Sequence, residues 1–195
     1  MTLPDRLPLP VPVLVGERVL LRALCPGDAP ALQRHADDAQ VARYLNARFP
    51  HPYTAAHAQA WCGHEANSGA FGYVWGLVAN EAPAEVLGCI GLIPQADWLR
   101  CNAEVGYWVG REHWRRGLAS DALCQVTDWA FAALPHLTRI FAPILAGNTG
   151  SQAVARKCGF VLEGVMRRSA MKLEKAVDRE LWATYRGDEP VPSSP

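Results

Sequence analysis

The sequence predicts a mixed α/β domain, in which a mostly antiparallel sheet contains one central β–α–β unit and carries helices on both faces. Three consecutive segments, 68–80, 85–93 and 102–110, are rich in aromatic and β-branched residues and have short polar connections, which favours an antiparallel meander. After Gly117 the apolar residues follow a helical period. A further strand-like segment comes after that single helix, which is typical of a right-handed β–α–β unit with parallel strands.

The segments before the meander predict one strand and two helices. Residues 18–24 alternate between apolar and polar side chains as a half-buried strand does. The Pro-Gly-Asp turn that follows offers Asp28 as the N-cap of a helix that extends to about Asp38. A second helix is expected from its N-cap, Thr54, to Glu65.

The segments after Gly117 complete the sheet. The long helix presents one apolar stripe that would pack on the sheet, formed by Leu118, Ala122, Val126, Trp129 and Ala133. Residues 139–145 predict the next strand, and a short helix over 149–157 ends at Gly159, which suits a left-handed C′ position. Two strands, within 160–170 and 179–187, close the chain.

Length and composition indicate one domain and exclude several classes of protein. We place the domain at residues 15–186, between a Pro-rich N-terminal tail (1–14) and a flexible C-terminal tail (187–195). The 19 Lys and Arg balance the 19 Asp and Glu, so we expect no nucleic-acid partner. No apolar run approaches the roughly 20 residues that span a bilayer, so we also expect no membrane contact.

The cysteines and histidines indicate neither disulfides nor a metal centre. The six cysteines form no C-x-x-C pair and lie mostly in apolar surroundings, which predicts reduced thiols in a cytoplasmic protein. His57 and His64 could share one helix face, but no cysteine or acidic residue lies near them at ligand spacing. We therefore expect no metal ligands.

The segment His113–Leu123, "HWRRGLASDAL", gathers arginines and a glycine directly before the long helix. The free N–H groups and the dipole at a helix start both favour an anion there. The alternative is a glycine that only eases a tight turn, with its arginines solvated on the surface.

Three motifs in order, "AEVGYWV", "WRRGLASDAL" and "NTGSQAVARKCGF", resemble the Gcn5-related N-acetyltransferase (GNAT) superfamily, in particular its branch of ribosomal-protein alanine N-acetyltransferases. The resemblance covers about residues 15–186. It implies acetyl-CoA as the cosubstrate, an amine acceptor attacked directly in a ternary complex, and a V-shaped splay between the two parallel strands. As a monomer or a homodimer, such a protein would need no other partner.

The family's phosphate loop reads roughly [Gln/Arg]-x-x-Gly-x-[Gly/Ala], and here Trp114 departs from that pattern at its first position. Small residues at Gly117 and Ala119 would let backbone N–H groups approach the pyrophosphate of coenzyme A. The strand 105–109 would pair with the pantetheine arm through its main chain, so its side chains need only pack. The resemblance thus implies these cofactor-binding residues: Val105, Tyr107, Trp108, Val109, Arg111, Arg115, Arg116, Gly117, Leu118, Ala119, Ser120, Asn148, Ser151 and Lys157.

The resemblance also suggests two catalytic residues. Glu104 would act as the base toward the amine, or else it is a solvated or salt-bridged glutamate at a strand end. Many relatives carry a tyrosine as the general acid where this chain has Ala155. Ser151 or solvent would then protonate the thiolate, although Ser151 could instead bond to the helix backbone. Lys157 would approach the adenosine 3′-phosphate or simply stabilise a helix C-terminus.

The acceptor stays open between a protein N-terminal α-amine and a small-molecule amine. Tyr44, Phe49, Tyr53 and Trp61 lie in the first two helical elements or between them, where they would line an amine pocket or belong to the core. The competing function is a non-catalytic acyl-CoA-binding module of the same fold.

Overall fold

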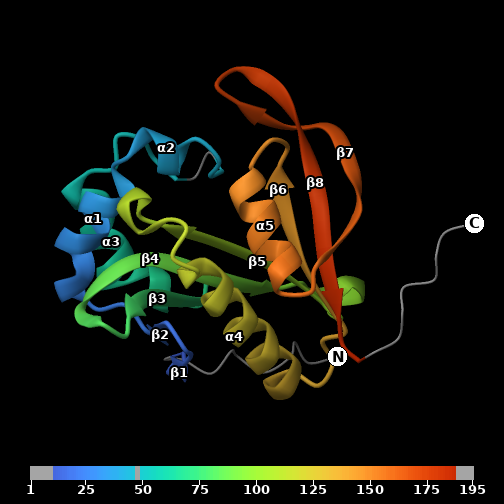
Figure 1. Ribbon diagram of the computed structural model, residues 1–195, viewed down its shortest axis with the longest axis horizontal. Helices are drawn as coiled ribbons and strands as arrows, with labels where there is room; N and C mark the ends of the chain where they lie inside the picture. The colour runs from blue at the N-terminus through green and yellow to red at the C-terminus, as the bar shows by residue number, and fades with distance from the viewer. Residues whose placement is uncertain (1–10, 47–48, 188–195) are drawn as a thin grey trace, which may run out of the picture.

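The computed structural model describes residues 11–46 and 49–187, which form one eight-stranded sheet with helices on both faces (Figure 1). In spatial order the strands are β1 (Leu14–Val15), β2 (Val19–Arg22), β3 (Tyr73–Ala79), β4 (Ala82–Pro94), β5 (Asn102–Val109), β6 (Arg139–Leu145), β8 (Lys175–Tyr185) and β7 (Val161–Lys172). Among the described strands, only β5 and β6 pair in parallel, and the other neighbours are antiparallel. The predicted fold class, with its meander and its parallel unit, is confirmed.

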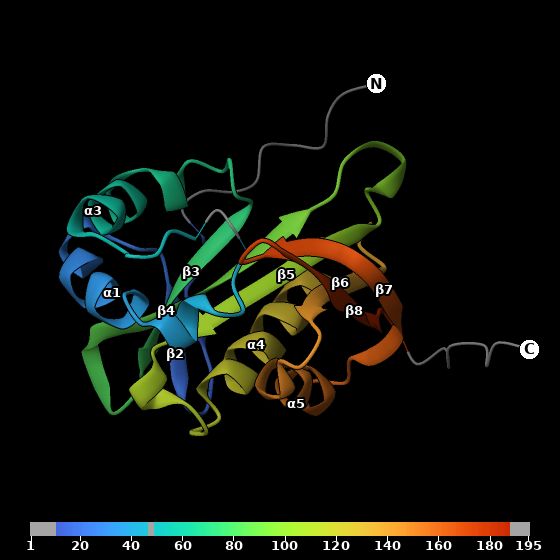
Figure 2. The same cartoon turned by 90° about the horizontal axis from the view of Figure 1, so that it is seen from above.

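The helices divide between the two faces of the sheet, as Figure 2 shows from above. The α-helices are α1 (Ala29–Ala36), α2 (Ala39–Ala42), α3 (Ala55–Gly63), α4 (Leu118–Ala133) and α5 (Thr149–Lys157). The described residues also form four short 3-10 helices: η1 (Pro26–Asp28), η2 (Glu65–Asn67), η3 (Asp97–Leu99) and η4 (Arg111–His113). One core lies between the sheet and α4 with α5, and a second lies between the sheet and α1 with α3.

Strand β3 contributes side chains to both cores. Every residue of β3 is buried. Its odd-numbered side chains, including Trp75 and Leu77, pack in the core under α4, whereas Val74 and Val78 pack in the core under α1 and α3. Because successive side chains of a strand point to opposite faces, a continuous apolar run suits a strand that is covered on both sides.

The two parallel strands separate soon after they begin. Their pairing is limited to three residues of β5, from Asn102, opposite Arg139, to Glu104, opposite Phe141. From Val105 onward, β5 keeps its hydrogen-bonded partner β4 on one side and has no strand partner on the other among the described residues. The splay that the family resemblance implied is therefore present.

Three local predictions were wrong. The helix expected up to Asp38 ends at Ala36, and Asp38 instead caps α2 by accepting hydrogen bonds from two backbone N–H groups. The Asp28 carboxylate makes no cap bond to α1 and instead accepts from Arg22 and from the backbone of Cys25. The expectation that all cysteines are reduced also fails.

Cys124 of α4 and Cys158, just after α5, form a disulfide. Their Cα atoms lie 5.4 Å apart, within the usual range for a disulfide. The two cysteines lie 34 positions apart in the sequence, so no local pattern indicated the pair; the packing of α4 against α5 brings them together. Of the four free cysteines, Cys62 and Cys89 are buried, as apolar surroundings predict, whereas Cys25 is exposed to solvent.

The N-terminal end of the described chain packs on the domain. Residues 1–10 of the predicted N-terminal tail and residues 188–195 of the C-terminal one lie outside the described residues. Val11 is buried, and the carbonyl of Pro12 accepts a hydrogen bond of 2.8 Å from the Trp75 indole. The domain's packing thus begins before the boundary that we placed at residue 15.

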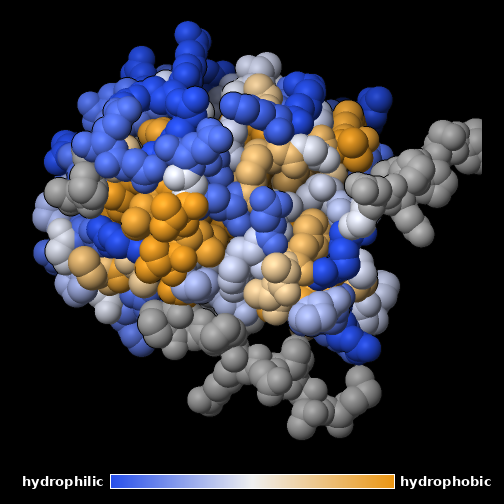
Figure 3. Space-filling view, turned by 60° about the horizontal axis from the view of Figure 1, so that its bottom comes forward, coloured by the Kyte–Doolittle hydropathy of each residue, from blue (hydrophilic) through white to orange (hydrophobic). Residues whose placement is uncertain are grey.

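The surface is mixed in polarity. On the face shown in Figure 3, apolar residues gather in one large patch beside polar surroundings. Within residues 11–46 and 49–187, no helix has the length and apolar character needed to cross a membrane.

Candidate functional site

The start of α4 has the geometry of an anion site. Gly117 precedes the helix in the left-handed region, with φ of +77°, and Arg115 is also left-handed, with φ of +62°. The first backbone bond of the helix joins the Asp121 N–H to the Gly117 carbonyl at 3.0 Å, and no side chain caps the helix in the described structure. The N–H groups of the first turn are therefore free to bind a ligand.

Two other elements hold this loop in place. The Trp114 indole donates to the carbonyl of Val109, the last residue of β5, at 2.7 Å. The Asp121 carboxylate accepts from the backbone N–H groups of Arg18 and Val19, at 2.8 and 2.9 Å, which fixes the first turn of α4 against β2. The aromatic residue that departs from the family pattern thus joins the loop to the end of β5.

Cationic side chains surround the loop, but not all of the predicted ones. Arg115 and Arg116 are exposed there, and Arg116 also lies 3.3 Å from the Glu81 carboxylate. Arg111 instead faces Asp38 at 3.9 Å, in a different cavity. Sequence reasoning missed Arg18, whose Cδ would lie 3.3 Å from a Cβ at Gly117. Arg18 reaches this loop because the start of β2 packs beside α4, where the Arg18 N–H donates to the Asp121 carboxylate.

Glu104 lies at the last paired position before β5 and β6 separate. Its carboxyl is partly buried, and this burial raises the pKa of Glu104, although the nearby Arg179 guanidinium of β8 lowers it. A carboxyl with a raised pKa at the fork between two strands is suited to accept a proton from a ligand.

The first turn of α5 lies across the splay from β5. Asn148 caps this helix, and its side-chain oxygen accepts from the Ser151 N–H at 3.2 Å. The Asn148 amide also donates to the Ser151 hydroxyl at 3.0 Å. The hydroxyl of Tyr107 reaches over from β5 and donates to the Ser151 carbonyl at 3.2 Å. The Tyr107 side chain therefore does more than pack.

The far end of α5 offers little toward the splay. Ala155 is fully buried, so the position where relatives carry a tyrosine contributes no polar group here. Lys157 is exposed in the last turn of the helix, where a cation is favoured by the helix dipole. This placement fits the structural alternative for Lys157 and leaves its contact with a phosphate a prediction.

Aromatic side chains from the connection between α2 and α3 pack on the face of β5 that carries Glu104. Phe49 stacks on Tyr53 with ring centroids 5.0 Å apart and meets Trp108 edge-on at 5.5 Å. The fourth aromatic residue, Trp61, packs on Phe71 instead. We call Phe49, Tyr53 and Trp108 the aromatic wall.

Two contacts join the segment around α2 to the C-terminal half of the domain. The Tyr44 hydroxyl donates to the Gly147 carbonyl at 3.2 Å, next to the start of α5. The Lys172 ammonium, near the turn of the β7–β8 hairpin, donates to the carbonyls of Ala42 and Leu45 at 2.8 and 2.6 Å. Figure 1 shows the hairpin and α2 on the same side of the sheet, above the ends of β5 and β6.

Comparison with known proteins assigns the family. The family model described as "Acetyltransferase (GNAT) domain" matches residues 18–161. The uncharacterized N-acetyltransferase YoaA of Bacillus subtilis is 31% identical over 80% of this chain and 87% of its own length.

Solved structures share the fold. RimJ of Mycobacterium smegmatis, in complex with CoA-disulfide, matches with a TM-score of 0.74 and 25% identity over 94% of this chain and 89% of its own. The ribosomal-protein-S5-alanine acetyltransferase of Vibrio fischeri matches with a TM-score of 0.75 and 19% identity, over 92% of this chain and 100% of its own. The chain therefore belongs to the GNAT family of acetyltransferases, enzymes whose cosubstrate is acetyl-CoA.

Proposed function

We propose that this N-acetyltransferase transfers the acetyl group of acetyl-CoA to the α-amine of a protein or peptide N-terminus. The observation that carries the proposal is the position of Glu104, a carboxyl of raised pKa at the fork of β5 and β6. We assign the binding of the pyrophosphate and of the pantetheine arm, and then the two proton transfers, to the residues around Glu104.

The pyrophosphate of acetyl-CoA would bind at the first turn of α4. The free N–H groups of Leu118, Ala119 and Ser120 and the helix dipole both favour a doubly charged group there. Arg18, with the exposed Arg115 or Arg116, would add charge-assisted hydrogen bonds.

The pantetheine arm would extend along the edge of β5 that faces β6, at residues 105–109. That edge lacks a strand partner in the described structure, and an extended chain that carries amides can pair with it as an added strand does. A backbone N–H of this edge would then polarise the thioester carbonyl, where negative charge develops in the transition state. The Val109 carbonyl already accepts a bond from Trp114, so we expect the pairing to use residues before it.

Glu104 would remove the proton from the acceptor, directly or through a water. An α-ammonium has a pKa near ~8, whereas a lysine side chain has one near ~10.4. The free amine thus costs about 3 kcal/mol less to form at an N-terminus than at a lysine, at ~1.4 kcal/mol per pKa unit. The raised pKa of Glu104 reduces the difference between its own pKa and that of the α-ammonium. Proton transfer to Glu104 therefore costs less from an α-amine than from a lysine, which favours an α-amine as the acceptor.

The departing thiolate would take its proton from the Ser151 hydroxyl. Ser151 lies in the first turn of α5, where the Asn148 amide orients its oxygen as an acceptor and leaves its hydrogen available. Tyr107 is a second hydroxyl within reach of this turn, and its bond to the Ser151 carbonyl positions the turn. Ala155 contributes no proton, so we assign none to it.

Relatives support a protein substrate. The Escherichia coli ribosomal-protein-serine acetyltransferase is 30% identical over 51% of this chain and 54% of its own. Near the proposed acceptor position, the aromatic wall would contact the first side chain of a peptide, and the hairpin bound to α2 through Lys172 would border its path.

A panel of acceptors tests the proposal with thiol release from acetyl-CoA as the readout. We expect turnover with short peptides that begin with a free Ser or Ala. We expect little with the same peptides when the N-terminus is blocked and a lysine is present. Turnover only with polyamines or other small amines would overturn the α-amine assignment. CoA binding without release on any acceptor would instead overturn the catalytic roles of Glu104 and Ser151.

A further inference from the structure

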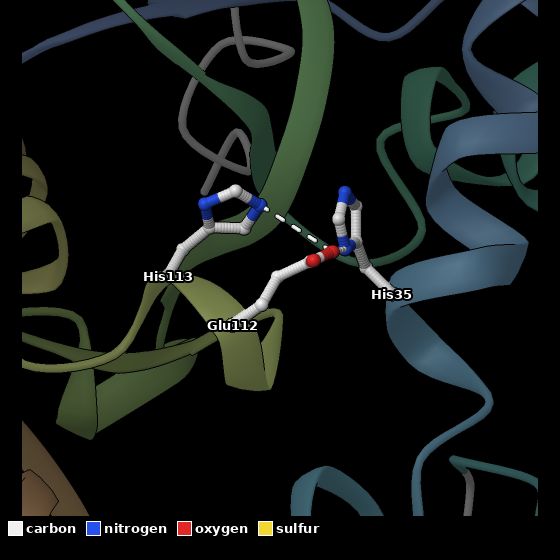
Figure 4. A group of neighbouring side chains, drawn as sticks. All are labelled: His35, Glu112 and His113. Atoms are coloured by element: carbon white, nitrogen blue, oxygen red, sulfur yellow. Dashed lines mark ion pairs between the residues drawn. The ribbon is translucent and has the colours of Figure 1, made fainter.

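Three potential metal ligands meet outside the acetyl-transfer site, although our sequence analysis expected none. His35 lies at the C-terminal end of α1, and Glu112 and His113 lie in η4, so residues far apart in the sequence converge (Figure 4). One oxygen of Glu112 is 3.1 Å from His35 Nδ1 and 3.7 Å from His113 Nε2. All three ligand atoms lie within 4.8 Å of one another.

The His35 imidazole is oriented as metal-binding histidines are. Its side chain is 2% exposed, and its Nε2 lies 2.6 Å from the Glu85 carboxylate, which Arg34 pairs with in turn. A carboxylate on the second ring nitrogen fixes the ring and makes the other nitrogen a better ligand. Gly110 leaves room for this ring, because a Cβ there would lie 2.6 Å from His35 Nδ1.

The His113 imidazole supplies an independent indication. Its Nε2 is buried and has no hydrogen-bond partner in the described part of the chain, and a buried polar atom without a partner is costly. This nitrogen faces the Glu112 carboxylate at a distance too long for a hydrogen bond (Figure 4). A cation between the two groups would satisfy both.

We propose that His35 Nδ1, His113 Nε2 and a Glu112 oxygen bind one divalent transition-metal ion, with Zn²⁺ as the best match. Tetrahedral zinc with nitrogen and oxygen ligands at about 2.0–2.2 Å places neighbouring ligand atoms about 3.3–3.5 Å apart. The two separations from the Glu112 oxygen, 3.1 and 3.7 Å, bracket that value, and the two imidazole nitrogens lie within 4.8 Å of each other. Two imidazoles and one carboxylate also form a common three-residue zinc ligand set.

The surroundings leave room for a fourth ligand. A cavity of about 390 Å³ borders His35 and Glu112 and opens to solvent, so a water molecule can complete the tetrahedron. Two arginines also line this cavity, but each lies beside a carboxylate: Arg34 beside Glu85, and Arg111 beside Asp38. These carboxylates offset the positive charges of the two arginines, which would otherwise repel a metal ion.

Two contacts must change when the ion binds. Any hydrogen between His35 Nδ1 and the Glu112 oxygen, 3.1 Å apart, is released to solvent as the ion takes its place. Arg116 lies 3.3 Å from His113 Nδ1 and can only donate, so that nitrogen accepts and Nε2 carries the hydrogen in the metal-free protein. With the metal on Nε2, the proton moves to Nδ1. The half-exposed Arg116 then turns fully to Glu81, which it already approaches at 3.3 Å.

The bound ion would fasten α1 to η4. Because η4 leads directly into Trp114 and the loop before α4, this link would restrain the proposed phosphate loop from outside. The metal site does not depend on the acceptor or on acetyl transfer, because none of its three ligands has a role there; Arg116 is the residue that it shares with the proposed phosphate loop, where Arg115 would then take the pyrophosphate contact.

Titration of the chelator-treated protein with Co²⁺ and then Zn²⁺ tests the site. The background is the Cys25→Ser variant, because Cys25 is an exposed thiol that could bind these ions. We expect one equivalent of Co²⁺ to give the visible absorption of a tetrahedral site without thiolate charge-transfer bands. Zn²⁺ should displace it and raise the melting temperature.

The variants separate this site from other binding. Glu112→Gln and His113→Ala, both at side chains with some exposure, should each weaken Co²⁺ binding by more than tenfold. Glu85→Gln, behind His35, should weaken it by about 10- to 100-fold. His136→Ala, which changes an exposed histidine outside the three-residue cluster, should leave Co²⁺ binding unchanged. Absence of saturable binding, or binding that survives His113→Ala in a folded variant, would show an ion-pair cluster only and overturn the proposal.

Discussion

Substitution of Gly117 by valine separates the proposed phosphate role from a purely structural one. The residue has φ of +77°, a conformation that costs a β-branched residue roughly 1–2 kcal/mol. The added Cβ would lie 3.3 Å from the flexible Arg18 side chain, which can shift at little cost. The fold should therefore survive, with a melting temperature about 2–8 °C lower, at ~2–4 °C per kcal/mol for a domain of this size.

The loss of cofactor binding should be larger. A side chain at this position would hold the pyrophosphate away from the first-turn N–H groups, and hydrogen bonds to charged groups contribute about 1.5–3 kcal/mol each. Loss of two such bonds predicts a Kd for CoA that is weaker by at least roughly 100-fold. Isothermal titration with CoA, beside thermal unfolding, measures both effects.

Gly159→Val is the matched control. Gly159 has the same φ of +77°, and nothing lies within 4 Å of its would-be Cβ, so the backbone strain is alike. Its location after α5 predicts a similar fall in melting temperature with CoA affinity retained. Normal CoA binding by Gly117→Val, or equal losses in the two variants, would refute the loop assignment.

Four further substitutions test the remaining roles. Glu104→Gln should lower kcat most below pH ~8, where the α-amine is protonated, and an unchanged pH profile would place the base elsewhere. Because the folded pKa of Glu104 is raised, its ionised form costs stability at pH 8; Glu104→Gln should raise the melting temperature there and not below pH 4.5. Ser151→Ala should lower kcat by about 100-fold without changing the Kd of acetyl-CoA, and an unchanged kcat would exclude it as the acid. Asn148→Ala removes the α5 cap and should cost about 1 kcal/mol in chemical unfolding, with a null result contradicting the cap. Asp28→Ala leaves Arg22 unpaired and should cost about 3–5 kcal/mol by the same method; a smaller loss would show the pair to be solvated.

The parts of the fold that depend on local pattern could be predicted from the sequence. The Thr54 cap, the left-handed Gly159 and the change of period after Gly117 each follow from residues close together in the chain. The position of β8 between β6 and β7 does not, because strand order depends on long-range packing rather than on any one segment's pattern.

The candidate site divides in the same way. Gly117 and Glu104 could be found because a contiguous motif marks each, whereas Arg18 reaches the loop only through the packing of β2 beside α4. The disulfide partners and the His35 cluster join segments separated by 34 residues or more, so no spacing rule revealed them. Asp28 shows a local prediction overridden, since a partly buried guanidinium binds its carboxylate more strongly than the helix N–H groups do.

A crystal structure of the protein with CoA bound tests the central claim most directly. We expect pyrophosphate oxygens about 3 Å from the backbone N–H groups of residues 118–120, with the pantetheine arm beside the free edge of β5. A pyrophosphate bound away from the start of α4, with that first turn in contact only with solvent, would contradict it.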